Sequence, residues 1–109
     1  MNLLEAMRIY VAVVEHGGLP GAASELKLGA AHVSDRIDGL ERYLGCRLLL
    51  RCADDGVACT DAGIAFHQCC VRTLSAVDDA MADAGIRPPD AHVAEVRRAA
   101  PHALHAARR

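Results

Sequence analysis

The stretch AAHVSDRIDGLERYL, residues 30–44, decides the fold of this chain. Its apolar residues recur at steps of four, three and four: Val33, Ile37, Leu40 and Leu44. That spacing places them on one stripe of an α-helix, with charged residues on the opposite side. The sequence therefore predicts a helix with one buried face and one exposed face.

The preceding stretch, PGAASELKL at residues 20–28, predicts a second and shorter helix. Pro20 suits its first turn because that position has no N–H group to leave unpaired. The small side chains of Ala22 and Ala23 let two helices approach closely, and Leu28-Gly29 forms a tight turn between them. Two short helices joined in this way are typical of a helix-turn-helix, in which the second helix enters the DNA major groove.

A further helix is expected before this pair, capped by Asn2 and stopped at Gly17-Gly18. Its apolar face carries Tyr10 together with a set of aliphatic residues. Those residues are Leu4, Met7, Val11 and Val14. We therefore expect a core helix, and a head of three helices.

Two short apolar runs follow the recognition helix, one at residues 46–51 and one at residues 57–59. They flank Asp55-Gly56, a dipeptide that supplies the positive φ angles of a tight hairpin turn. The pattern predicts a small β-hairpin directly after a helix-turn-helix. Such a hairpin is a wing.

A long fourth helix is predicted from Thr60, which caps it, to Gly85. Along it a seam repeats at steps of three and four: His67, Cys70, Leu74, Val77, Met81 and Ala84. Such a seam is typical of a coiled coil and predicts a homodimer. A helix packed back on its own head is the alternative, which we disfavour because the period continues beyond the head's reach.

A zinc site made by His67 and Cys70 from two chains is a further alternative, but a single His-Cys pair lacks the paired motif of zinc sites. We predict no metal and no cofactor. The five cysteines lack zinc-finger spacing, and we expect reduced thiols. No catalytic motif is recognisable, so we do not expect an enzyme.

The composition fits one small, mostly α-helical domain, since 52% of the 109 residues are hydrophobic and only one is Phe. No run reaches the length of a membrane span, and no basic segment precedes an apolar one at the start. We therefore expect a cytoplasmic protein. The expected organisation is a winged helix-turn-helix head at 1–60, a linker and dimerisation helix at 61–85, and a Pro/Ala/Arg-rich tail at 86–109, either a short helix or disordered.

Together these residues form the pattern AAxxLxLGxAxVSxxIxxLExxLGxRLLxR from Ala22 to Arg51, followed by TDAG from Thr60 to Gly63. The pattern resembles the N-terminal winged helix-turn-helix and linker helix of LysR-type transcriptional regulators, with molybdate-responsive regulators as the nearest competitor. The resemblance covers about residues 1–85 and implies a dimeric, DNA-binding regulator. The two-lobed effector domain of that family has no counterpart in the 109 residues, so we expect a short form without an inducer site.

By the same resemblance, the candidates for DNA contact are His32, Ser34, Arg36, Arg47 and Arg51. The family usually has Ser-Gln-Pro where this chain has Gly29-Ala30-Ala31, and usually Arg where it has Asp35. The wing tip, commonly basic, carries Asp54 and Asp55. These departures predict weakened DNA contacts, because phosphate contacts dominate the affinity of such proteins.

The overall charge fits that interpretation. Up to Gly63 the chain has six Lys or Arg residues and nine Asp or Glu residues, a net charge of −3, whereas DNA-binding domains usually carry a basic surface. Two functional hypotheses stay open, beside a third possibility, a non-functional remnant that would unfold with poor thermal cooperativity. The chain is a regulator that binds double-stranded DNA, or it is an interaction protein that keeps the fold and modulates another regulator, for instance as a heterodimer with a full-length one.

Overall fold

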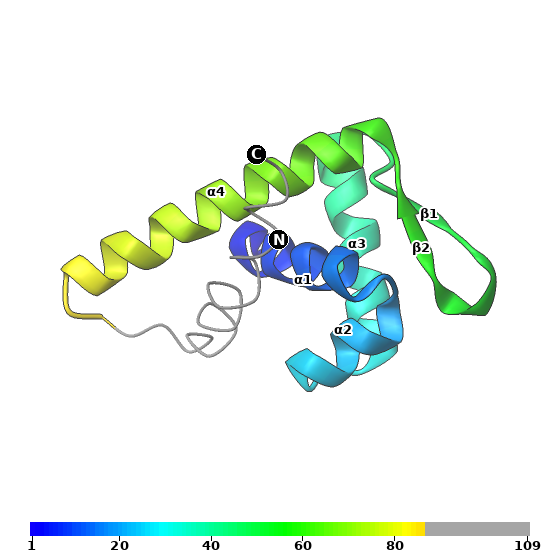
Figure 1. Ribbon diagram of the computed structural model, residues 1–109, viewed down its shortest axis with the longest axis horizontal. Helices are drawn as coiled ribbons and strands as arrows, with labels where there is room; N and C mark the ends of the chain where they lie inside the picture. Colours follow the sequence, from blue (N-terminus) through cyan, green and yellow to red (C-terminus); the bar gives the residue numbers. More distant parts are fainter. Residues whose placement is uncertain (87–109) are drawn as a thin grey trace. The chain divides into compact units, whose positions relative to one another are not determined.

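The computed structural model describes residues 1–86, so the predictions for the tail lie outside the described residues. The chain divides into two compact units, Met1–Leu74 and a second unit that begins at Ser75. The first unit contains α1 (Leu3–His16), α2 (Leu19–Leu26), α3 (Ala30–Leu44), the strands β1 (Leu49–Arg51) and β2 (Val57–Cys59), and the start of α4 (Asp61–Asp83) (Figure 1). The predicted winged helix-turn-helix is confirmed.

The predicted helix ends are built by local chemistry. The Asn2 side chain accepts a hydrogen bond from the Glu5 N–H at 3.0 Å, which caps α1. Gly17 and Gly45 close α1 and α3 with φ of 76° and 74°, angles that glycine adopts without strain. Gly29 precedes α3 and supplies no side-chain cap.

The core of the first unit lies between α1, α2 and α3 and extends to the base of the hairpin. Its largest fully buried side chains are Tyr10, Ile9, Ile37, Leu40, Leu48, Leu49, Leu74, Val11, Val13, Val33 and Cys70. The prediction that Leu4 faces this core is wrong, because its side chain is 41% exposed. The buried face of α1 is rotated toward Ala6, Ile9, Tyr10 and Val13.

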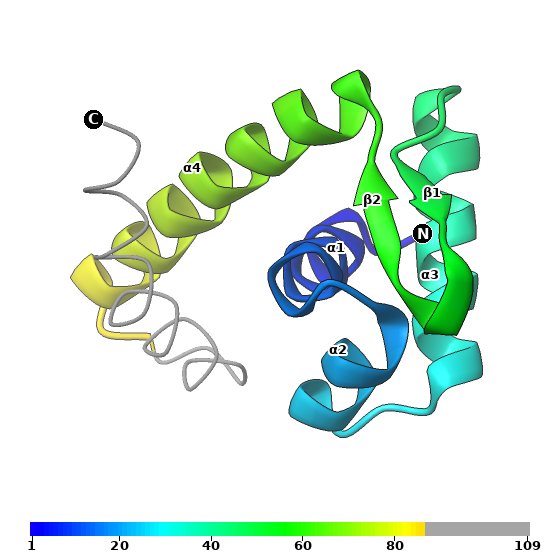
Figure 2. The same ribbon diagram turned by 45° about the vertical axis from the view of Figure 1, so that its right-hand side comes forward.

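The hairpin pairs β1 with β2 antiparallel, with Leu49 opposite Cys59 and Arg51 opposite Val57. The hairpin prediction is confirmed, but its turn is not the predicted Asp-Gly turn. The positive φ angles fall on Asp54 and Asp55, both 61°, whereas Gly56 has φ of −77°. Gly56 is extended because it forms a β-bridge with Gly18, which attaches the hairpin loop to the turn between α1 and α2 (Figure 2).

The start of α4 is tied to the base of the hairpin. Thr60 Oγ1 accepts a hydrogen bond from the Gly63 N–H at 2.9 Å and donates one to the Arg47 carbonyl oxygen at 2.7 Å. Cys70 and Leu74 of the predicted seam are buried in the core of the same chain, with 0% and 1% exposure. That packing removes both side chains from any contact with a partner chain. Val77 and Met81 are half-buried, and dimerisation stays a prediction.

No helix within residues 1–86 is both long and apolar enough to cross a membrane. The same residues contain no group of three or more metal-ligating side chains that could hold an ion.

Candidate nucleic-acid interface

The outward face of α3 is acidic. Val33, Ile37 and Leu40 turn inward and are fully buried. Asp35 and Asp38 lie on the other side, with side chains 67% and 50% exposed. The surface that a helix-turn-helix presents to DNA therefore carries two carboxylates in this chain.

Ser34 and Arg51, two of the five predicted DNA contacts, are brought together. Arg51 extends from β1, and its Nη2 donates to Ser34 Oγ at 3.4 Å and to Asp38 Oδ1 at 3.3 Å. Both acceptors lie on α3, one turn apart. Arg51 of the hairpin thus makes two polar contacts with α3 at the surface.

Arg36 lies elsewhere. Its guanidinium pairs with Glu5 of α1, Nε to Oε1 at 3.4 Å, and with the neighbouring Asp35, Nη1 to Oδ2 at 2.9 Å. These two carboxylates hold Arg36 at the α1 side of α3, away from the contact between Arg51 and Ser34. The structure therefore does not group Arg36 with the other predicted contacts.

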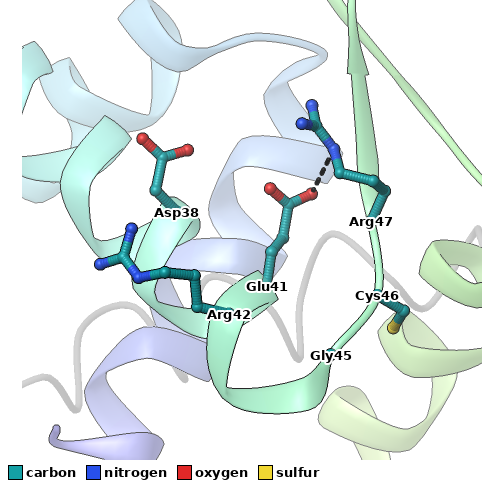
Figure 3. A pocket seen from close by; sticks show the side chains of 6 residues that line it. All are labelled: Asp38, Glu41, Arg42, Gly45, Cys46 and Arg47. Carbon is teal, nitrogen blue, oxygen red and sulfur yellow. Dashed lines mark ion pairs between the residues drawn. The ribbon is translucent and has the colours of Figure 1, made fainter.

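Arg47 lies at the base of the hairpin and is 65% exposed. Its Nε is 3.6 Å from Glu41 Oε2, and its Nη2 donates to the Leu49 carbonyl oxygen at 3.3 Å. Arg47 and Glu41 line an open surface hollow formed by Asp38, Glu41, Arg42, Gly45, Cys46 and Arg47 (Figure 3). In this view Glu41 points from α3 toward Arg47, and a dashed line marks their ion pair.

His32, in the first turn of α3, is half-buried, and its Nε2 atom is buried without a hydrogen-bond partner among the described residues. His32 is therefore less available as a DNA contact than its position in the sequence indicated.

The wing tip is acidic and well anchored. Asp54 and Asp55 are exposed in left-handed conformations that Asp adopts more readily than most side chains. The Val57 N–H donates to the Gly17 carbonyl oxygen at 3.0 Å, and a Cβ atom on Gly18 would lie 2.7 Å from the Asp55 carbonyl oxygen. The loop is thus fixed on the α1–α2 turn, so both carboxylates hold a defined place on the surface.

Sequence reasoning missed the residue that orients the hairpin. Glu41 is 8% exposed, and its Oε2 accepts hydrogen bonds from the Leu48 N–H at 2.7 Å and the Leu49 N–H at 3.0 Å. These bonds satisfy two donors at the entry to β1. The signal was present in the sequence, because Glu41 follows Leu40 on the side of the helix that carries the apolar stripe.

A second missed contact joins α1 to the start of α4. The buried Tyr10 hydroxyl donates to the Gly63 carbonyl oxygen at 2.7 Å and lies 3.8 Å from Cys59 Sγ. Burial raises the pKa of Tyr10 well above its usual value, and the adjacent Cys59 adds to the rise. Gly63 has no room for a side chain, since a Cβ atom would lie 2.1 Å from the Leu48 carbonyl oxygen.

Residues 4–64 match the family described as bacterial regulatory helix-turn-helix protein, lysR family. Over 79 residues the chain is 38% identical to an HTH-type transcriptional repressor of Pseudomonas aeruginosa and 33% identical to the HTH-type transcriptional activator AaeR of Escherichia coli. Each alignment covers 72% of this chain and 25% of the relative. The chain thus spans about a quarter of the length of these relatives.

Solved structures show the same fold. A CbnR DBD–DNA complex superposes with a TM-score of 0.71 at 27% identity, covering 74% of this chain and 92% of that chain. A complex of the BenM DBD with catB site 1 DNA gives a TM-score of 0.71 at 34% identity, covering 75% of this chain and 90% of that chain. In both cases the similarity extends over nearly all of the neighbour.

Proposed function

The chain belongs to the LysR family of bacterial regulatory helix-turn-helix proteins and carries the DNA-binding domain of a transcriptional regulator; from this premise we propose how its surface meets DNA. The α3 helix enters the major groove, and the hairpin β1–β2 lies against the adjacent backbone. The observation that carries the proposal is the contact of Arg51 in the hairpin with Ser34 in α3. It places two groups able to donate to DNA on one surface.

The arginine and serine side chains are proposed to contact different parts of the DNA. Arg51 and Arg47 supply guanidinium groups to phosphate oxygens, and the Ser34 hydroxyl reaches a phosphate or a base edge. Two solved neighbours that share the fold, the CbnR and BenM domains, are complexes with DNA, which supports DNA as the partner of this surface. Arg36, held by Glu5 and Asp35, contributes to phosphate binding only after it leaves these carboxylates.

The proposed affinity is low for the family. Asp35, Asp54 and Asp55 are exposed, and the resemblance to the family implies basic side chains at the first of these positions and at the wing tip. Each phosphate contact contributes about 0.9 to the slope of log affinity against log salt, so the loss of two or three contacts per head removes most non-specific binding. A carboxylate beside a phosphate adds repulsion to that loss.

The test is binding of the full chain to its own upstream DNA and to a mixed-sequence duplex between about 50 mM and 200 mM salt. We expect weak, strongly salt-dependent binding. Asp35→Arg should raise the affinity several-fold, whereas the matched control Asp83→Arg, at the end of α4, should change it little. Absence of binding at every salt concentration, by the wild type and by Asp35→Arg alike, would exclude this function and favour the interaction protein.

A homodimer formed through the second half of α4 is the proposed assembly. The variants that test it must spare Cys70 and Leu74, because both belong to the core of the head. Val77→Glu and Met81→Glu place charges on the remaining positions of the seam. Sedimentation should show dimers for the wild type and monomers for the variants, whose heads should still unfold cooperatively although without the stabilisation that association gives. A monomeric wild type would contradict the proposal.

A further inference from the structure

Arg51 is held against α3 by a residue that the proposed interface does not use. Its Nη2 atom lies 3.3 Å from Asp38 Oδ1 and 3.4 Å from Ser34 Oγ. The contact joins β1 to α3 across 13 residues of sequence for Asp38 and 17 for Ser34. Its geometry thus couples two elements that both face the DNA in the proposed complex.

This contact is not needed to hold the hairpin. The Arg51 and Asp38 side chains are 40% and 50% exposed, and exposed ion pairs contribute little to stability because water and salt screen them. The base of the hairpin has stronger attachments, namely the two N–H groups bound by Glu41 and the Thr60 hydroxyl on the Arg47 carbonyl oxygen. Loss of the pair should therefore leave the fold intact.

The pair does change what Arg51 offers to DNA. A phosphate that approaches the guanidinium meets the Asp38 carboxylate beside it, and two negative charges at such close range repel each other. Resting on the proposed function, we infer that Asp38 is a positioning residue that competes with DNA phosphate for Arg51 and thereby lowers the affinity of the head for DNA.

The other acidic residues of this surface act differently. Asp35 pairs with Arg36, which is also held by Glu5 of α1. Within residues 1–86, Asp54 has no ion pair or side-chain hydrogen bond. Asp54 therefore affects DNA through its charge alone, whereas Asp38 acts through a named arginine.

The experiment compares Asp38→Asn with Asp54→Asn in the full chain, with a labelled mixed-sequence duplex as the probe. Each variant removes one negative charge, and Asn suits the left-handed backbone at position 54. Only Asp38→Asn should release Arg51. We expect it to raise the affinity about five- to tenfold at low salt and to steepen the salt slope by about 0.9 for each head bound, the value of one added phosphate contact. Asp54→Asn should raise the affinity less and leave the slope unchanged.

Two further variants show whether the effect passes through Arg51. In an Arg51→Met background, Asp38→Asn should no longer steepen the slope, and its gain should fall to that of Asp54→Asn. Asp38→Glu, which keeps the charge, should retain the wild-type slope. Equal slopes for the two Asn variants, or a gain in the Arg51→Met background as large as in the wild-type background, would overturn this inference alone. No salt-dependent binding by any variant would overturn the proposed function together with it.

Discussion

The framework of the head and its outward surface differ in how closely they follow the family pattern. The framework comprises the inner face of α3, the base of the hairpin and the start of α4, where Glu41, Thr60 and Gly63 make short contacts. The surface comprises the outer face of α3 and the wing tip, where Asp35, Asp54 and Asp55 are exposed. We expect the fold to depend on the first region and the proposed affinity for DNA on the second, so variants should separate the two properties.

The largest effect is expected at Gly63. Gly63→Ala places a Cβ atom 2.1 Å from the Leu48 carbonyl oxygen and 2.8 Å from the Tyr10 hydroxyl, and neither the backbone nor the buried ring can move away easily. We expect destabilisation by more than about 3 kcal/mol. Thermal and urea unfolding of the purified variant measure it.

The control is Gly39→Ala, also a glycine inside a helix. Its Cβ would meet the Met1 side chain at 3.7 Å and the Arg42 side chain at 3.9 Å, both ordinary contacts. Alanine should therefore stabilise α3 by about 1 kcal/mol through its higher helix propensity. Equal effects of the same sign at the two positions would mean that the close approach at Gly63 does not exist.

Glu41→Ala should be the next most damaging change. It leaves the Leu48 and Leu49 N–H groups without their acceptor at a buried site, which costs about 2–3 kcal/mol. Glu41→Gln keeps one oxygen acceptor and should cost about half as much. If both variants unfolded like the wild type, Glu41 would not support the entry to β1.

Sequence patterns recover the framework because its residues follow helical and strand periods. Val33, Ile37 and Leu40 on α3, and the limits of α1, α3 and the hairpin, follow from spacing and capping residues. The exceptions are contacts that depend on distant elements. Leu4 is exposed although its spacing from Met7 and Val11 fits the apolar stripe predicted for α1. The positive φ angles fall on Asp54 and Asp55 because Gly56 is extended in a bridge with Gly18.

The candidate site was less predictable than the fold. The sequence showed which types of residue lie on α3 and on the wing, including Asp35 where the resemblance to the family implies an arginine. Their pairing was not, because Arg36 with Glu5 and Arg51 with Asp38 are contacts between elements distant in sequence. Helical period likewise could not tell that Cys70 and Leu74 pack into their own head rather than against a second chain.

A moderate effect is expected at Tyr10, the contact between α1 and the start of α4. Tyr10→Phe removes the hydrogen bond to the Gly63 carbonyl oxygen but keeps the ring, which lies 5.6 Å from the Phe66 ring between centroids. We expect a loss of about 1–1.5 kcal/mol at neutral pH. Urea unfolding measures it, and a loss above that of Glu41→Ala would reverse the proposed order within the framework.

Because Tyr10 is buried in its protonated form, we also expect the free energy of unfolding to fall at alkaline pH. The pKa of Tyr10 is raised in the folded state above its ordinary value of 10.0, so the folded protein retains a proton that the unfolded chain releases. This contribution is complete below about pH 10 and falls as the pH rises further. The difference in unfolding free energy between wild type and Tyr10→Phe should shrink in that range, and a constant difference up to about pH 11 would contradict it.

The smallest effect on stability, and the sharpest separation of the two regions, is expected at Gly29. This residue precedes α3 and supplies no side-chain cap, and a Cβ atom added to it would meet no other atom within 4 Å. Gly29→Ser adds a hydroxyl that caps the helix, which stabilises the head by only a few tenths of a kcal/mol. The same hydroxyl lies at the entry of the recognition helix, where it can donate to a phosphate, so affinity for a mixed-sequence duplex should rise about two- to fivefold. Because a hydroxyl is neutral, the salt slope should not change. A stability gain as large as that of Gly39→Ala without any change in affinity would place Gly29 with the framework rather than with the surface proposed to meet DNA.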